Sequence, residues 1–226
     1  MNNLSAVLDN YDAVYREVSG LSSGAAMLVL ASKTVSKDVL VGLSSARPGV
    51  IYGENKVQEL LSKYYFSSDV TWQFIGRLQT NKVKYIVDKV SMIQSVDSLR
   101  LAEEIEKRCA KIEKRMDILV EVNIGQEESK GGVSLSELDA LLTKIVSMPH
   151  LRLRGLMSVL PNANENVLIP LYEELHAVFV RVKETYGQDI SYLSAGMSGD
   201  YALALQHGSN MVRIGSAVFG ERHYDK

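Results

Sequence analysis

The sequence predicts an α/β protein whose fold is a single closed (β/α)8 TIM barrel with an extra helix at the N-terminus. Eight short apolar segments alternate with helical segments, and only the N-terminal helix is left over. Strands that alternate with helices form parallel sheets through right-handed crossovers. Eight such units in about 200 residues fit the small end of the barrel size range. Since no linker or low-complexity stretch interrupts them, we expect one domain over residues 1–226.

The first half of the chain contains the N-terminal helix and four strand–helix units. Apolar residues recur every three or four positions over residues 3–19, which indicates an amphipathic helix that ends at Gly20. Apolar runs predict strands at 27–32, 50–53, 71–75 and 90–96. Helices are predicted at 36–46, at 55–65, at 81–88 and after the Asp97-Ser98 cap. The apolar stripe of the last helix includes Cys109, which we therefore assign to the core.

The second half repeats the pattern four times. Strands are predicted at 116–124, 151–159, 190–193 and 211–214. The helices that follow them are expected at 134–146, 166–186, 198–206 and 217–221. Ser134 and Glu137 have the spacing of a capping box at the start of the first of these helices. Gly187 and Gly208 stand where two of the helices end, a position that glycine favours.

An open, doubly wound sheet is the alternative architecture. A dinucleotide-binding sheet of that kind carries a glycine-rich turn after its first strand, but residues 32–36 contain no glycine. Side-chain alternation also favours a barrel, because Val120, Val122 and Ile124 share one face, which packs under helices. The other faces then direct Glu121, Asn123 and Arg213 into the barrel. A buried arginine needs a partner or a ligand.

The composition argues against several function classes. The chain is 46% apolar and 23% charged with a net charge of −2, so neither nucleic acid nor a membrane is expected as a partner. No apolar run reaches the length of a membrane span, and the N-terminus lacks the pattern of a secretory signal. One cysteine allows no internal disulfide, which is typical of a cytoplasmic protein. The sequence shows no metal-ligand spacing, so we expect no metal.

The first predicted strand ends in Lys33, at the end of the strands where barrels build their active sites. A lysine amine in that position can attack a carbonyl carbon and form a Schiff base. A surface lysine after a strand is the commoner alternative. This segment alone does not choose between the two.

Two segments rich in small residues, 194–200 and 213–220, follow the seventh and eighth predicted strands. Small residues let backbone N–H groups approach an anion, and a helix N-terminus favours negative charge. Barrels frequently bind phosphate with these two loops. Ordinary helix capping by Ser198 and Ser216 is the alternative for each segment, but their joint position favours a phosphate site.

Closure of the barrel makes Lys33 a neighbour of this phosphate site. The combination indicates either pyridoxal 5′-phosphate held as an internal aldimine or a phosphorylated carbonyl substrate, as in a Schiff-base aldolase. Arg213 lies just below the phosphate loops and favours the cofactor. It would face the pyridine nitrogen and keep it unprotonated, which weakens the ring as an electron sink.

Several segments, in this order along nearly the whole chain, resemble the YggS/PROSC family of pyridoxal phosphate homeostasis proteins. They are LASKT (30–34), YGENKVQE (52–59), FIGRLQTNK (74–82), VEVNI (120–124), RGLM (154–157), GMSGD (196–200) and VRIG (212–215). The resemblance implies a barrel like the N-terminal domain of alanine racemase. Departures from the family pattern, at Phe74, at Tyr52 and in a shorter segment over 46–50, are expected at the rim of the site.

The resemblance also implies which residues bind the cofactor. Lys33 would carry the covalent aldimine of pyridoxal 5′-phosphate, and Arg213 would approach the pyridine nitrogen. Ser198, Gly215 and Ser216 would hold the phosphate. The ring pocket would be lined by Asn55, Met157 and Ser194.

The resemblance and the absence of a recognisable base both favour a carrier over an enzyme. The racemases of this fold use a tyrosine from a further β domain, and the chain ends directly after the eighth strand, so we expect that domain to be missing. The four histidines are scattered, and no residue is predicted to be catalytic. We expect a monomeric, non-catalytic protein that buffers the cofactor and delivers it to pyridoxal phosphate-dependent apo-enzymes. An amino-acid racemase is the first alternative, and a Schiff-base aldolase is the second.

Overall fold

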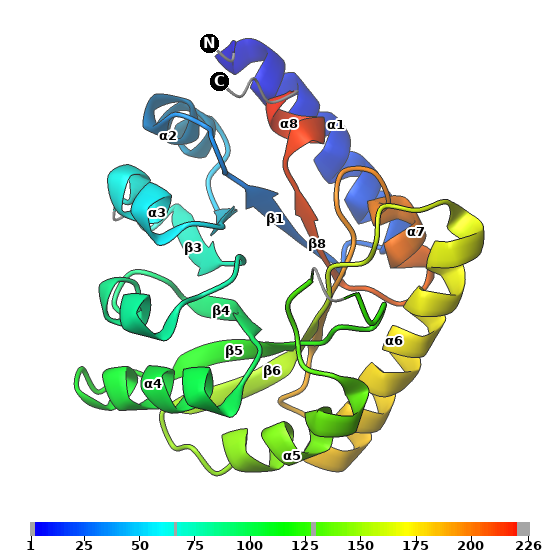
Figure 1. Cartoon of the computed structure of the whole chain (residues 1–226). Coiled ribbons are helices and arrows are strands. Elements are labelled where there is room, and N and C mark those ends of the chain that lie inside the picture. The colour runs from blue at the N-terminus through cyan, green and yellow to red at the C-terminus, as the bar shows by residue number, and fades with distance from the viewer. Residues whose placement is uncertain (1–2, 66, 128–129, 221–226) are drawn as a thin grey trace.

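Eight parallel strands close into a barrel in sequence order in the computed structural model, which describes residues 3–65, 67–127 and 130–220 (Figure 1). The first and last strands pair in parallel, with Leu28 opposite Val212 and Leu30 opposite Ile214, so the sheet is closed. The predicted (β/α)8 barrel is confirmed. The strands are β1 (Met27–Ala31), β2 (Val50–Glu54), β3 (Val70–Phe74), β4 (Met92–Val96), β5 (Met116–Glu121), β6 (Leu151–Met157), β7 (Tyr192–Ser194) and β8 (Met211–Ile214).

Helices surround the barrel and connect consecutive strands (Figure 1). The extra N-terminal helix contacts the helices that follow β1, β7 and β8, and it buries Val7, Val14 and Val18. The helical elements are α1 (Leu4–Leu21), α2 (Lys37–Ala46), α3 (Val57–Lys63), η1 (Thr80–Tyr85), α4 (Leu99–Ala110), α5 (Leu135–Ile145), α6 (Glu165–Tyr186), α7 (Tyr201–Gln206) and α8 (Ser216–Phe219).

The side chains of the barrel form two apolar layers, as the alternation along the strands predicts. The outer layer lies between strands and helices and includes Val120, Val122 and Ile124. The inner layer fills the barrel and consists of Val29, Ile75, Met92, Leu119, Met157 and Met211. Cys109 is fully buried in the outer layer, and burial raises the pKa of its thiol to about 11. The prediction that Cys109 is a core residue is therefore confirmed.

The segment predicted as a helix over 81–88 is a 3-10 helix, η1, followed by a turn. The Lys82 N–H donates to the Gln79 carbonyl, and the Ile86 N–H donates to the Val83 carbonyl. In this tighter helix, side chains three positions apart lie above one another. Val83 and Ile86 therefore both enter the core, where each is fully buried.

The fifth strand ends earlier than predicted, and Asn123 does not point into the barrel. The Asn123 N–H donates to the Val133 carbonyl of the following loop. Its side chain bonds both backbone groups of Glu127, with Nδ2 donating to the carbonyl oxygen over 2.9 Å and Oδ1 accepting from the N–H over 3.2 Å. Asn and Asp side chains commonly close turns in this way, and this local bond removes Asn123 from the sheet.

Two further expectations are wrong. Ser134 precedes α5, but its hydroxyl bonds the Glu137 carboxylate directly instead of a backbone N–H, so no capping box forms. Tyr52 and Phe74 do not lie at a rim, because both are fully buried in the outer core layer, where the Tyr52 hydroxyl donates to the Leu40 carbonyl over 2.7 Å. Their inaccessible positions follow from the even alternation of side chains along β2 and β3.

Gly155 is a point at which β6 tolerates no side chain. Its φ is +149°, and a Cβ built there would lie 1.8 Å from the Tyr192 carbonyl oxygen of β7. We expect Gly155→Ala to lower the free energy of unfolding by about 2 kcal/mol or more, since the strand pairing must shift to relieve the clash. Urea denaturation measures this difference. Gly20→Ala, within α1 and with no atom within 4 Å of the added Cβ, is the control that should be neutral or stabilising.

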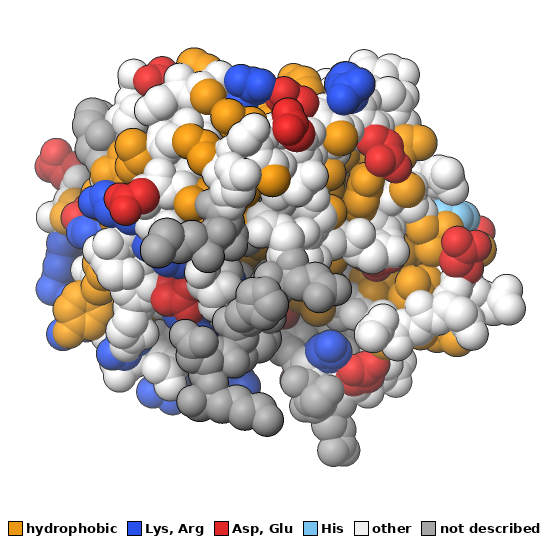
Figure 2. Space-filling model, turned by 90° about the horizontal axis from the view of Figure 1, so that it is seen from above, with side chains coloured by type: hydrophobic (Ala, Val, Ile, Leu, Met, Phe, Trp, Pro, Cys, Tyr) orange, Lys and Arg blue, Asp and Glu red, His pale blue; other side chains and the backbone are white. Residues whose placement is uncertain are grey.

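Charges of both signs are mixed on one face of the molecule (Figure 2). On the face shown in Figure 2, acidic and basic side chains lie beside one another with apolar side chains between them. This mixture accords with the net charge of −2. Within residues 3–65, 67–127 and 130–220, no helix has both the length and the apolar character needed to cross a bilayer.

Candidate functional site

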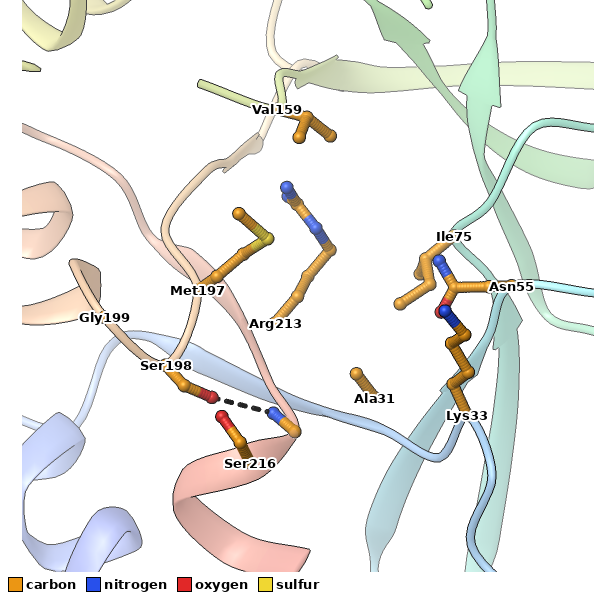
Figure 3. Close-up of a pocket in the computed structure, with 11 residues that line it drawn as sticks. Ala31, Lys33, Asn55, Ile75, Val159, Met197, Ser198, Gly199, Arg213 and Ser216 are labelled. Carbon is orange, nitrogen blue, oxygen red and sulfur yellow. Dashed lines mark hydrogen bonds between the residues drawn. The ribbon is translucent and has the colours of Figure 1, made fainter. Parts of the chain in front are cut away.

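A cavity of about 620 Å³ opens at the C-terminal ends of the strands (Figure 3). Six of the residues singled out from the sequence line it, namely Lys33, Asn55, Ser198, Arg213, Gly215 and Ser216. In Figure 3, Lys33 and Asn55 lie on one side of the cavity, Ser198 and Ser216 lie on another, and Arg213 lies between them. An amine, a guanidinium and two hydroxyls, from distant parts of the chain, therefore share one space.

A buried ion pair supports the strand end that carries Lys33. Glu54, at the end of β2, is fully buried, and its Oε2 accepts from the Lys63 ammonium of α3 over 3.0 Å. The same oxygen accepts from the Ser32 hydroxyl over 2.8 Å. Lys63 Nζ also donates to the Ser32 carbonyl over 2.9 Å. Ser32 is thus bonded twice to the charged pair, and it directly precedes Lys33.

Three more bonds extend this ion pair to other residues of the site. Glu54 Oε1 accepts from the backbone N–H of Asn55 over 2.8 Å. Glu59 Oε2 accepts from Lys63 Nζ and from the backbone N–H of Thr34, each over 2.8 Å. Burial acts to raise the pKa of Glu59, but the bonds from Lys63 and Thr34 outweigh it and lower the pKa. The residues on both sides of Lys33 are therefore held by the same charged cluster.

Ser198 connects the loops that follow β7 and β8. Its Oγ accepts from the Gly215 N–H over 3.1 Å and from the Ala217 N–H over 3.3 Å. Since a hydroxyl that accepts two bonds still carries one proton to donate, Ser198 can offer that proton to an anion in the cavity. Gly199 beside it is open, because a Cβ built there would meet nothing within 4 Å. Ordinary helix capping does not explain a serine that bridges two loops.

Asp200 sets the shape of the loop after β7. Its Oδ1 accepts from the Met197 N–H over 2.7 Å, and its Oδ2 accepts from the Tyr172 hydroxyl of α6 over 2.5 Å. Tyr172 is almost fully buried, and burial together with the bond to Asp200 raises the pKa of its hydroxyl. The tyrosine therefore stays protonated and keeps donating, which holds Met197 and Ser198 at the cavity wall.

Arg213 lies on the inner face of β8 and is only 4% exposed. Its Nη1 donates to the Ser194 hydroxyl over 2.7 Å, and its Nη2 donates to the Ser158 carbonyl over 2.8 Å. Burial lowers the pKa of the guanidinium, and the charge of Glu121 acts in the opposite direction. Both direct partners are neutral, so the site keeps a positive charge at its base.

Two residues that the sequence suggested for the ring pocket do not line the cavity. Met157, at the end of β6, is 1% exposed and packs in the inner apolar layer. Ser194 is fully buried, with its hydroxyl bonded to Arg213. Both side chains point into the barrel, but they lie beneath the cavity instead of at its wall. Five other described residues also line the cavity: Ala31, Ile75, Val159, Met197 and Gly199. Ala31 could have been expected from the alternation of side chains along β1, because it lies two residues after Val29, which points inward.

Glu121 is a buried acid on the inner face of β5. Burial, with a contribution from the Asp97 charge, raises its pKa to about 7, although Arg213 and Arg77 act to lower it. A carboxyl whose pKa in the folded protein exceeds its ordinary value stabilises the fold at low pH. That contribution is complete below about pH 4.5 and is lost as the pH rises to about 7.

Glu121→Gln is therefore expected to be more stable than the wild type at pH 8 by up to about 3 kcal/mol, since the amide stays neutral at every pH. The advantage should shrink towards pH 4.5, where the wild-type carboxyl is also neutral. Urea denaturation of both proteins at the two pH values measures the difference. An advantage that does not change with pH would show that Glu121 is not the group that titrates.

Comparisons with known proteins point to one group of relatives. Residues 52–223 match the family model described as the alanine racemase N-terminal domain. The chain is similar to the pyridoxal phosphate homeostasis protein of Aquifex aeolicus, with 41% identity over 224 residues that cover 98% of this chain and 97% of the relative. It is similar to the protein of that name in Escherichia coli K12, with 35% identity over 232 residues that cover 100% of this chain and 97% of the relative.

A solved structure gives the same indication. The solved structure of PipY from Synechococcus elongatus with pyridoxal phosphate bound has a TM-score of 0.80 to this protein at 25% identity. The similarity covers 92% of this chain and 100% of that chain.

Proposed function

The chain belongs to the pyridoxal phosphate homeostasis proteins, a family with the alanine racemase N-terminal domain, and from this membership we propose that it binds pyridoxal 5′-phosphate as a carrier. The observation that supports this proposal is the convergence of Lys33, Arg213, Ser198 and Ser216 on one cavity. Lys33 suits the aldehyde of the cofactor, Arg213 suits its ring nitrogen, and the two serines suit its phosphate. The PipY structure with the cofactor bound supports the same ligand.

The side chains of the cavity fit the cofactor in their chemistry. When bound, the cofactor supplies an aldehyde with which a lysine amine reacts reversibly. Lys33 is the amine that we propose for this bond. Ser198 and Ser216 would bind the phosphate through their hydroxyls and Gly199 through its N–H, while Gly215, whose N–H donates to Ser198, would line the same phosphate site. Asn55 would contact the ring from the side of Lys33.

Two features of the cavity bear on the choice between a carrier and a catalyst. A guanidinium has only donors, so a pyridine nitrogen that faces it must act as an acceptor and stay unprotonated. The ring is then a weaker electron sink than a protonated ring, but arginine also faces this nitrogen in some pyridoxal phosphate enzymes, so Arg213 alone does not choose between a carrier and an enzyme. Among the described residues that line the cavity there is no tyrosine, cysteine or histidine that would serve as a base opposite Lys33.

The proposal includes further points that rest on family membership and composition. We infer a single barrel domain that acts as a monomer in the cytoplasm. The one cysteine allows no internal disulfide, which is typical of proteins in that reducing compartment. Apo-enzymes that require pyridoxal phosphate would receive the cofactor. An amino-acid racemase is the remaining alternative, and a Schiff-base aldolase of a sugar phosphate is less consistent with Arg213 at the ring position.

The decisive experiment is the visible absorption spectrum of the purified protein with added pyridoxal 5′-phosphate, before and after borohydride reduction. We expect a yellow band that reduction removes, and peptide mass spectrometry should then find the cofactor on Lys33. A protein that stays colourless would overturn the proposal and favour the aldolase. Incubation of the loaded protein with L-alanine in D2O tests the racemase, since a racemase would incorporate deuterium and form D-alanine.

A further inference from the structure

A chain of buried polar side chains crosses the barrel interior and ends at Arg213. The chain consists of Gln73 of β3, Gln94 of β4 and Ser194 of β7, each at most 3% exposed. Gln94 Nε2 donates to Gln73 Oε1 over 2.6 Å, and Ser194 Oγ donates to Gln94 Oε1 over 2.7 Å. Arg213 Nη1 then donates to Ser194 Oγ over 2.7 Å. Four strands are thus linked through side chains in the core.

Arg213 determines the direction of every bond in this chain. A guanidinium only donates, so the Ser194 oxygen accepts from it, and the single Ser194 proton must find another acceptor. That acceptor is Gln94 Oε1, which fixes the orientation of the Gln94 amide and turns its Nε2 towards Gln73. If the amide flipped, the buried Ser194 proton would lose its acceptor, which is costly in a dry interior.

The contacts also fix the plane of the guanidinium. Nη1 is held by Ser194, and Nη2 is held by the Ser158 carbonyl. Ser158 is itself anchored, because its Oγ donates to the Val122 carbonyl over 2.8 Å. Two anchors on two different nitrogens orient a planar group, whereas one anchor would leave it free to rotate. Since both anchors are neutral, they position Arg213 without cancelling its charge.

We propose that Gln94 is a positioning residue for Arg213, which it orients through Ser194. The inference rests on the proposed function, in which Arg213 faces the pyridine nitrogen of the cofactor. Gln94 does not line the cavity, so it acts on the ligand only through this chain. Ser194 has the same role, which explains why it lies beneath the cavity instead of at its wall.

The test measures the dissociation constant of pyridoxal 5′-phosphate and the position of the visible band in Gln94→Leu. We expect binding about tenfold weaker and a shifted band, because Arg213 loses its fixed orientation, while borohydride still links the cofactor to Lys33. Ser194→Ala removes the same link with the loss of one hydroxyl only, so it tests the inference even if Gln94→Leu fails to fold. It should weaken binding in the same direction.

A double-mutant cycle with Arg213→Met separates positioning from other effects. If Gln94 acts through Arg213, adding Gln94→Leu to Arg213→Met causes no further loss of affinity. Losses that add in the double variant would overturn the inference, as would wild-type affinity and spectrum in Gln94→Leu. A wild-type protein that forms no reducible band would instead refute the proposed function itself.

Ser95→Ala is the matched structural control. Ser95 is a neighbouring residue of β4, is 1% exposed, and donates to the Gly76 carbonyl instead of to the Arg213 chain. The variant loses one buried hydrogen bond on the same strand, so its stability should fall by an amount comparable to that of Ser194→Ala. Its affinity for the cofactor and its absorption band should remain those of the wild type. A tenfold loss of affinity in this control would mean that general loosening of β4 explains the effect.

Discussion

Replacement of Lys33 with alanine is expected to abolish the covalent link between the protein and pyridoxal 5′-phosphate and to weaken binding about 100-fold, or about 2.7 kcal/mol. Among the described residues that line the cavity, Lys33 has the only primary amine. The yellow band and the borohydride-stable adduct should both disappear. Binding should not vanish, because Ser198, Ser216 and Arg213 remain in place to hold the phosphate and the ring.

Pyridoxine 5′-phosphate, which has no aldehyde, separates the two contributions. It should bind the wild type and Lys33→Ala with equal affinity, as measured by calorimetry, because it relies only on the non-covalent contacts. Lys56→Ala is the control for the loss of a nearby positive charge, since Lys56 is exposed and adjoins Asn55. This variant should keep the band. An adduct that forms on a different lysine of Lys33→Ala would contradict the assignment of Lys33.

Glu54→Gln is expected to lower the free energy of unfolding by about 3 kcal/mol and to slow adduct formation at Lys33. The buried Lys63 ammonium would lose its bond to the fully buried carboxylate and keep only the Glu59 carboxylate as a charged partner. Removing one partner of a buried ion pair costs about 3–5 kcal/mol. We expect a cost at the low end of this range, because Glu59 remains as a charged partner of Lys63. The rate should fall because an amide has one acceptor oxygen and cannot accept from both Ser32 and Asn55 as the carboxylate does.

The double variant Glu54→Gln/Lys63→Met tests this explanation. Removing both buried charges should restore a large part of the lost stability, since no unpaired ammonium remains in the interior. Urea denaturation measures stability, and single-turnover borohydride trapping measures the rate at Lys33. We expect stability to recover more than the rate does, because the double variant also lacks the bond from Lys63 to the Ser32 carbonyl. A double variant as unstable as Glu54→Gln would show that the charge of Lys63 is not the cause.

The elements of this fold that could be predicted from the sequence are those set by local pattern. Periodicity of two or of three to four residues is a property of neighbouring residues, so it located the eight strands and indicated which side chains of β5 and β8 point inward. Periodicity failed where a side chain made a bond that the strand pattern does not contain. Asn123 left the sheet to bond Glu127, four residues further on, and the segment with Val83 formed a 3-10 helix.

The residues of the candidate site also fall into two groups, those that the sequence could predict and those that only the tertiary structure shows. The sequence by itself determined the residues at the ends of the strands, such as Lys33, Ser198 and Ser216, because a reactive or small residue after an apolar run can be read directly. Only the tertiary structure decided which inward side chains reach the cavity and which, like Ser194, lie beneath it. The depth of a side chain in a barrel depends on the tilt and stagger of all the strands together, and no single segment contains that information. The chain from Gln73 to Arg213 likewise exists only because closure brings β3, β4, β7 and β8 around one interior.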